Sequence, residues 1–261
     1  MKSRRGIALT LAVLALFLCI SIVYLVRLKT LCCAREVQRL ELRLVRLRRI
    51  GSNLYGVYFY NALKSLYYDF KTAVTSKSVF RGKLEEQATT LSHLFSDFFN
   101  VTAACDLAKI EGPYELADIP SSFKGVKGYG QGSTCFSVHL RCTLSDGFVI
   151  VRLNKTYMLC HPFRYFRAKK TVDGLSDEIR AVGVCNRSVL YRVAHRYLQS
   201  KLDGFEYSLR LSTEKRGDVC LVTLIVTVTD LKAVPNYIWP ETRASVTFTR
   251  RIAFKDSALR P

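Results

Sequence analysis

The residues of this chain that could act as nucleophiles, general bases or metal ligands are its nine cysteines and four histidines. A hydrolase triad needs a nucleophile, a base and an orienting group, and no Gly-x-Ser-x-Gly or protease-like motif accompanies the histidines. The chain has no C-x-x-C and no H-x-x-x-H pair, and Cys32-Cys33 is too tight for zinc. The sequence therefore predicts no catalytic residue, no metal site and no cofactor. The histidines, expected to be ordinary side chains, include His93, His139 and His195.

Six of the nine cysteines lie in the distal part of the chain, and this even number suits three disulfide bonds in an oxidising compartment. They are Cys105, Cys135, Cys142, Cys160, Cys185 and Cys220. A hairpin expected after residue 135 returns the chain so that Cys160 comes back beside Cys135, and a bridge between these two is geometrically plausible. The connectivity of the six stays open, because many pairings are allowed.

Three of the six asparagines stand in Asn-x-Ser/Thr sequons, at Asn100, Asn154 and Asn186. Only a luminal or extracellular region can be glycosylated at such sites. The sequons and the cysteines therefore agree in predicting a glycoprotein region outside the cytoplasm.

An N-terminal apolar segment predicts a membrane span, and the orientation of this span decides on which side of the membrane the cysteines and sequons lie. Residues 7–26 carry no charge, and a helix of this length crosses a hydrocarbon core of about 30 Å. A secretory signal peptide has a shorter apolar region and a small-residue cleavage site. We therefore expect an uncleaved signal anchor over residues 7–26, behind a short cytoplasmic tail over residues 1–6.

The charges beside the span conflict with the sequons on orientation. Three basic residues precede the span, whereas Arg27, Lys29 and a series of arginines follow it. The positive-inside rule would place the more basic flank in the cytoplasm. The sequons and distal cysteines outweigh the charge count, so a single-pass type II protein of the cell membrane is expected, with its C-terminal region extracellular or luminal.

Residues 27–50 contain no glycine or proline, and we interpret them as a basic helical stalk. Val37, Leu40, Leu44 and Leu47 follow the 3-4-3 spacing of a weak heptad seam. One interpretation is a parallel homodimer through the stalk, cross-linked at Cys32 or Cys33 and favoured by the shared membrane. The other is a monomeric amphipathic helix whose arginines lie near lipid phosphates.

The remaining chain predicts an α+β ectodomain over residues 54–235. We expect strands over 54–68, 135–144, 148–153 and 219–228, helices over 78–99 and 186–201, and an irregular connection over 103–132. Two helices on one antiparallel sheet in the order β-α-β-β-α-β form a ferredoxin-like fold. Residues 236–261 form a C-terminal extension, in which 245–248 either adds a strand or trails.

The segments 78–87, 130–140, 205–208 and 226–230 resemble a SEA domain. The closest resemblance is to the membrane-proximal SEA domain of matriptase-like type II transmembrane serine proteases, whose anchor precedes that domain in the same way. The resemblance implies a ferredoxin-like ectodomain. We expect no protease domain after residue 235.

The SEA resemblance also implies a reactive bond, because some SEA domains cleave themselves at a Gly-Ser bond ahead of a strand. Gly132-Ser133 stands at the matching place. Thr-Cys-Phe follows it here, instead of the run of valines typical of cleaving members. An intact strand start is therefore the preferred interpretation.

The formal net charge of +19 indicates either a solvated basic surface, which is the preferred interpretation, or a surface that binds polyanions. No aromatic-and-basic RNA motif is present, so nucleic acid is rejected and lipid headgroups or sulfated glycans remain. The expected function is non-enzymatic: adhesion, scaffolding or binding of an extracellular protein partner at the cell surface. The alternatives are a truncated protease relative that modulates the full-length enzyme, and a receptor for polyanionic glycans.

Overall fold

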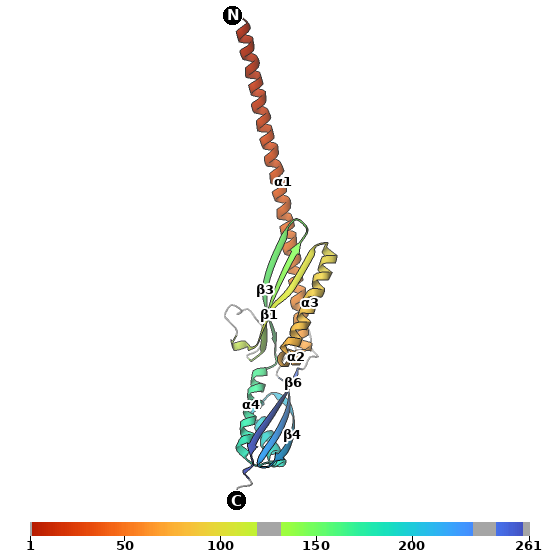
Figure 1. Ribbon diagram of the computed structural model, residues 1–261, viewed down its shortest axis with the longest axis vertical. Helices are drawn as coiled ribbons and strands as arrows, with labels where there is room; N and C mark the ends of the chain where they lie inside the picture. Colours follow the sequence, from red (N-terminus) through yellow and green to blue (C-terminus); the bar gives the residue numbers. More distant parts are fainter. Residues whose placement is uncertain (1, 119–131, 232–243, 258–261) are drawn as a thin grey trace.

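The computed structural model describes residues 2–118, 132–231 and 244–257. Figure 1 shows an elongated molecule in which a long N-terminal helix leads into two layered modules, with the C-terminus at the far end. Each module consists of helices packed on a three-stranded antiparallel sheet. Part of the connection expected over 103–132, and most of the C-terminal extension before residue 244, lie outside the described residues.

The long helix α1 (Lys2–Tyr68) continues from the apolar segment through the stalk into the first module. The strand expected over residues 54–68 is therefore wrong. Its buried side chains recur at helical spacing, at Leu54, Tyr58, Ala62 and Leu66. The aromatic composition suggested a strand, but no proline interrupts the helix before residue 68.

The first module places α1 and α3 against one sheet. After α1 come the short helix α2 (Phe70–Thr75), α3 (Lys77–Phe99), β1 (Thr102–Glu115), the 3₁₀ turn η1 (Leu116–Asp118), β2 (Thr134–Ser145) and β3 (Ile150–His161). The sheet order is β1-β2-β3, with α1 packed on β2 and β3 and α3 packed on β1. The predicted helix over 78–99 and the strand over 135–144 are both confirmed.

Strand β1 replaces the first part of the irregular connection that the glycines and prolines suggested. β1 is an edge strand, and its pairing with β2 shifts register between Glu111 and Tyr114. Gly112 and Pro113 lie at this register shift. Proline has no backbone N–H, and at an irregular position of an edge strand the missing donor breaks no hydrogen bond in the middle of the sheet. Gly112 has φ +109, and a Cβ atom there would lie 2.9 Å from the Cys135 carbonyl oxygen. Glycine suits this position because it adopts a positive φ without steric penalty and has no Cβ atom.

The hairpin between β2 and β3 turns at the predicted Asp146-Gly147. The Asp146 Oδ1 atom accepts hydrogen bonds from the backbone N–H groups of Phe148 and Val149 at 3.1 and 3.0 Å, and Gly147 has φ +88. Strand β3 begins at Ile150 and runs to His161, well past the predicted end at residue 153. The predicted hairpin is confirmed, with a longer second strand.

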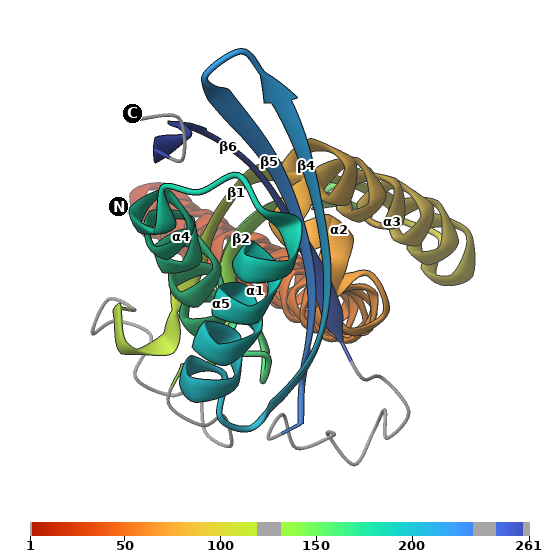
Figure 2. The ribbon, with the colours of Figure 1, turned by 90° about the horizontal axis from the view of Figure 1, so that it is seen from below.

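The second module, like the first, has its helices before its three strands. It contains α4 (Tyr165–Val182), α5 (Arg187–Lys201), β4 (Phe205–Arg216), β5 (Val219–Asp230) and β6 (Ser245–Lys255). The sheet order is β4-β5-β6, and both helices lie on one side of it, as Figure 2 shows. Helix α5 and the central strand β5 agree with the expectations for 186–201 and 219–228, and residues 245–248 begin β6.

This arrangement differs from the single sheet of a ferredoxin-like fold. Each sheet is a meander of consecutive antiparallel strands, and among the described residues no α-helix lies between two paired strands. The predicted order lacked β1, α4 and β4 and contained a false strand, which together produced the β-α-β-β-α-β pattern. The α+β class with an N-terminal apolar helix is confirmed, whereas the ferredoxin-like arrangement implied by the SEA resemblance is not.

Two helical glycines give a matched test of how closely α1 lies on the first sheet. A Cβ atom at Gly51 would lie about 2.2 Å from Leu153 Cδ1, whereas one at Gly82 on α3 meets nothing within 4 Å. We expect Gly51→Ala to lower the free energy of unfolding by roughly 1–3 kcal/mol through overpacking. Gly82→Ala should raise it by roughly 0.5–1 kcal/mol. Chemical denaturation of both variants measures this, and equal shifts of the same sign would contradict the close approach.

Candidate functional site

The Gly132-Ser133 bond directly precedes β2, as the sequence predicted. Gly132 has φ +88, which glycine adopts without steric penalty. Ser133 is buried, and its carbonyl oxygen accepts a hydrogen bond from the Leu116 N–H at 2.9 Å. An intact bond stays the prediction here, with self-cleavage as its alternative.

The three sequon asparagines are all exposed and lie on three different elements. Asn100 ends α3 with a left-handed backbone at φ 51, and Asn154 lies on the edge strand β3. Asn186 caps α5, because its Oδ1 atom accepts hydrogen bonds from Ser188 N and Val189 N at 3.0 and 3.3 Å. Their positions leave room for glycans, and their glycosylation stays a prediction.

The six distal cysteines form three pairs at bonding distance. The pairs are Cys105–Cys142, Cys135–Cys160 and Cys185–Cys220. The predicted bridge from Cys135 to Cys160 is confirmed, because these residues are direct partners on β2 and β3. Cys105 and Cys142 are partners on β1 and β2, so two disulfides link all three strands of the first sheet.

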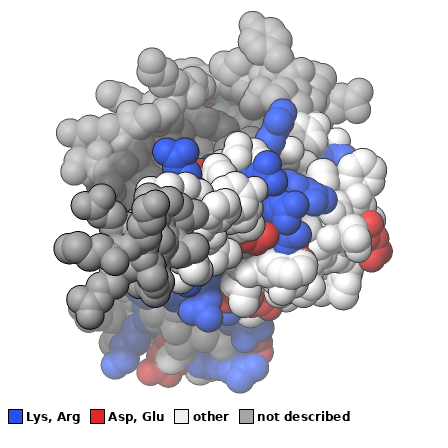
Figure 3. Space-filling model, turned by 90° about the horizontal axis from the view of Figure 1, so that it is seen from above, with Lys and Arg blue, Asp and Glu red and all other residues white. Residues whose placement is uncertain are grey.

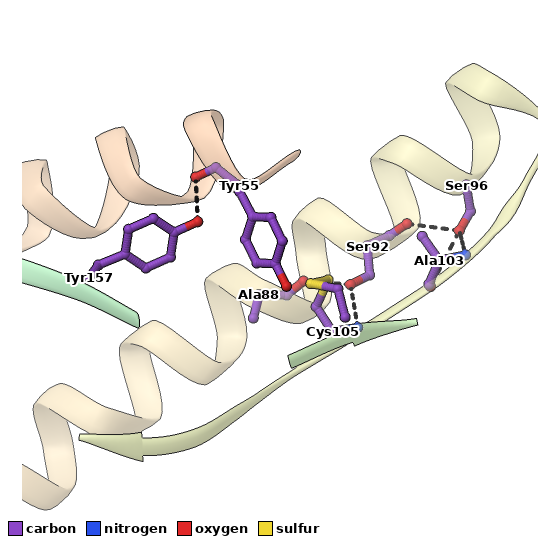
Figure 4. The surroundings of a disulfide bond; sticks show 8 residues. Tyr55, Ala88, Ser92, Ser96, Ala103, Cys105 and Tyr157 are labelled. Atoms are coloured by element: carbon purple, nitrogen blue, oxygen red, sulfur yellow. Dashed lines mark hydrogen bonds between the residues drawn. A yellow bond between two sulfur atoms is a disulfide. The ribbon is translucent and has the colours of Figure 1, made fainter. Parts of the chain in front are cut away.

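The outer edge of β1 is fastened to α3 beside the first disulfide (Figure 4). The Ser92 Oγ atom accepts a hydrogen bond from Cys105 N at 3.0 Å and donates one to the Ala88 carbonyl at 2.8 Å. The Ser96 Oγ atom accepts a hydrogen bond from Ala103 N at 2.9 Å. Helix α3 therefore satisfies N–H groups that an edge strand would otherwise leave open for another chain.

The four histidines have separate environments. His93 and His195 are exposed, and the half-buried His139 bonds to Thr156 through its Nδ1 atom at 2.8 Å. His161 differs from the expected ordinary side chain, because its ring is buried against Phe70 at a centroid distance of 4.2 Å. Among the described residues, no group of three His, Cys, Asp or Glu side chains could hold a metal ion.

A buried ion pair lies within the second module, close to His161 at the end of β3. The Arg164 guanidinium bonds to both carboxylate oxygens of Asp230, at 2.9 Å from Nε and 2.6 Å from Nη2. The Asp230 side chain is 0 % exposed and the Arg164 side chain is 15 % exposed. Arg164 precedes α4 and Asp230 ends β5, and the guanidinium also lies 4.3 Å from the Phe205 ring centroid. Sequence reasoning missed this pair, because the two residues lie far apart in the chain.

The stalk side chains do not form the single seam that the heptad spacing suggested. Val37 and Leu40 are exposed, whereas Leu44 packs on the first module and Leu47 is fully buried there against Leu144. The C-terminal part of the predicted seam, Leu44 and Leu47, therefore packs in the core of its own chain. Figure 3 views the molecule from the side on which the N-terminal helix enters, and Lys and Arg side chains gather near the middle of this face.

A groove between α1 and α3 lies at that end of the first module. Its larger part has a volume of about 670 Å³, and a second part of about 360 Å³ shares Asn53 and Phe99 with it. The larger part is lined by Ser52, Asn53, Gly56, Val57, Leu94, Phe95, Phe98 and Phe99. The second part adds Leu42, Val45, Arg46, Arg49 and Ile50.

The groove combines exposed apolar side chains with polar groups at one end. Phe98 is 82 % exposed and Leu94 is 58 % exposed, although both are large hydrophobic residues. Mostly apolar concave sites of 300–1,000 Å³ with a few polar groups are typical of small-molecule binding. The sequence signal was present in the α3 side chains at 94 and 98, which lie beside the buried face formed by Leu84, Ala88 and Leu91.

Comparisons with protein-family models, with curated proteins and with solved structures found no match to this chain. The class of protein is defined by the fold and the site alone. It is an α+β protein with three disulfide pairs and a helix long and apolar enough, by length and composition, to span a membrane. The most apolar 18-residue window of that helix is 0 % buried.

Proposed function

We propose that the chain is a single-pass type II membrane glycoprotein whose ectodomain acts by binding a ligand or partner at the cell surface. The observation that carries this proposal is the continuity of α1. The helix that contains the candidate span also supplies Leu47, Leu54 and Tyr58 to the core of the first module. The most apolar window of the described part of this helix is 0 % buried, so it needs another apolar environment, and a bilayer supplies one.

The orientation follows from the cysteines and sequons. Disulfides persist in oxidising compartments, and the three cysteine pairs all lie on the C-terminal side of the span. The three exposed sequon asparagines lie on the same side. These six cysteines and three sequons favour an extracellular or luminal ectodomain over the orientation that the basic stalk would predict.

A binding role is favoured over catalysis by where the reactive side chains lie. The Ser133 side chain is buried, and the His161 ring is enclosed between Tyr67 and Phe70. Neither residue is open to a substrate. The exposed groove between α1 and α3 instead offers an apolar surface with polar groups at one end.

Glycosylation of the three sequons tests the proposed topology. We expect Asn100→Gln, Asn154→Gln and Asn186→Gln each to remove one glycosidase-sensitive step in gel mobility, because all three asparagines are exposed outside the cytoplasm. Asn61→Gln, which changes an asparagine outside any sequon, is the matched control.

Protease protection completes this test. In intact vesicles the ectodomain should resist added protease, and it should be cleaved only after the membrane is opened by detergent. Unmodified sequons, together with cleavage of the ectodomain by protease added to intact vesicles, would overturn the proposed topology.

A further inference from the structure

The groove between α1 and α3 lies at the end of the first module that faces the candidate span. Its first lining residue, Leu42, lies roughly 24 Å along the helix axis from Val26. The groove is thus outside the bilayer but close to it.

Small residues on α1 keep the floor of the groove open. Ser52 and Gly56 lie one helical turn apart, and a Cβ atom at Gly56 would meet nothing within 4 Å. The opposite wall consists of α3 side chains, with Phe95 and Phe99 in ring contact at a centroid distance of 5.4 Å. This part of the groove can take an apolar chain without moving either helix.

The end of the groove nearer to the span is positively charged. Arg46 and Arg49 line it, and Arg46 Nη2 donates a hydrogen bond to the Phe99 carbonyl at 3.0 Å. Within the described ranges, neither arginine has a carboxylate at ion-pair distance. An anionic group placed here would gain charge-assisted hydrogen bonds that the protein itself does not supply.

We propose that this groove binds a single-chain anionic amphiphile, such as a fatty acid or a lysophospholipid with an anionic headgroup. The acyl chain lies along Gly56, Val57 and Phe98, and the headgroup carboxylate or phosphate bonds to Arg49 and Arg46. The proposal rests on the proposed binding function and names its ligand class. It does not depend on which side of the membrane carries the ectodomain.

Charge favours this occupant over a second copy of the chain. A parallel partner would bring its own Arg46 and Arg49 to the same site, because two chains anchored in one membrane align their stalks. Like charges facing each other across an interface are unfavourable. An anionic headgroup instead neutralises them.

Photolabelling tests the proposal on the full chain in nanodiscs of zwitterionic lipid. The probes are a fatty acid with a diazirine near the end of its chain, an anionic lysophospholipid with the same chain, and the corresponding fatty alcohol. We expect both anionic probes to label residues 52–57 and 94–99, and to exceed the alcohol roughly tenfold, as expected for losing one charge-assisted hydrogen bond. Labelling by only one anionic probe identifies the headgroup while still supporting the proposal.

Two matched pairs of variants separate the groove from the rest of the surface. Gly56→Phe fills the groove, whereas Gly82→Phe adds the same ring at an open site on α3 outside it. Arg49→Gln removes the headgroup contact, whereas Arg48→Gln changes an exposed neighbour that does not line the groove. We expect roughly tenfold less labelling in the first member of each pair and no change in the second.

Three results would overturn the proposal. They are labelling confined to the span at residues 7–26, equal labelling by the alcohol and the anionic probes, and cross-links that join two chains through the groove. The last result would assign the groove to an interface between copies. A failure here leaves the topology test with glycosidase and protease unaffected, so the two proposals can fail separately.

Discussion

Asp230→Ala is expected to lower the free energy of unfolding by roughly 3–5 kcal/mol, the usual cost of breaking a buried ion pair by removing one partner. The substitution leaves the Arg164 guanidinium, 15 % exposed, without its carboxylate. The guanidinium would keep the hydrogen bond from its Nη2 atom to the Gly204 carbonyl, at 3.1 Å, and its contact with the Phe205 ring. Chemical denaturation of the detergent-solubilised, disulfide-bonded chain measures the loss.

The effect should be concentrated where the start of α4 meets the end of β5. The Asp230 Oδ2 atom also accepts a hydrogen bond from the Arg164 backbone N–H at 3.0 Å, which fixes the start of α4. The Leu231 N–H donates to the Gly204 carbonyl at 3.1 Å, so the end of β5 and the start of β4 meet at the same point. Removing the carboxylate therefore frees both the side chain and the backbone of Arg164.

Two controls distinguish the loss of a buried ion pair from the loss of any charged side chain. Asp177→Ala breaks the exposed pair with Arg180 on α4, where we expect a loss below about 1 kcal/mol. The double variant Arg164→Met, Asp230→Leu should recover much of the loss, because it removes the unpaired buried charge. A loss at Asp230→Ala as small as that at Asp177→Ala would show that the pair does not hold the start of α4 against the end of β5.

Acidification is expected to destabilise the protein through His161. Burial lowers the pKa of His161 to about 3, and the negative charge of Asp230 opposes this only in part. The unfolded chain has the ordinary histidine pKa of about 6.5. Between these two values the unfolded state binds a proton that the folded state does not, so stability falls as the pH decreases from about 6.5 towards 3.

The slope from one such histidine reaches at most about 1.4 kcal/mol per pH unit, so the loss between pH 7 and pH 5 is roughly 2 kcal/mol. His161→Asn removes the titrating ring and offers an acceptor in place of Nδ1, which accepts a hydrogen bond from the Phe163 N–H at 3.1 Å. The variant should be less stable at pH 7, because it loses ring contacts with Phe70 and Tyr67.

The measurement compares the free energy of unfolding of the parent and His161→Asn across pH 7 to pH 4. The variant should show the flatter profile, and the two curves should converge as the pH falls. Parallel profiles would mean that His161 is not the group that makes the folded state sensitive to acid in this range.

Elements with a strong local period were predictable from the sequence. Helix α3 has buried residues at Phe80, Leu84, Ala88 and Leu91. The second half of strand β2 alternates between buried and more exposed side chains, and a turn-forming Asp-Gly pair follows it. Helix α5 was recognisable from its apolar face, and Asn186 indeed caps it. In each case neighbouring residues alone carry the information, because one face of the element is buried and the other is not.

Other elements were missed although a local signal was present. Helix α4 buries Ala168, Val172, Leu175 and Ile179 at helical spacing, and Gly183 ends it with φ +64. Strand β1 was hidden by its glycine and proline, which fall at a register shift. Aromatic residues over 54–68 suggested a strand, although their buried positions follow a helix. Composition competed with periodicity at these places, and periodicity was the better guide.

The sequence by itself determined the apolar helix, the α+β class, the β2–β3 hairpin and the one disulfide that closes it. Each of these depends on residues close together along the chain. Only the tertiary structure decided that the strands form two meanders, that Leu47 serves its own core instead of a stalk seam, and that Arg164 meets Asp230. The physical reason is that a periodic pattern shows which face of an element is buried, whereas the partner that buries it lies far away in the chain.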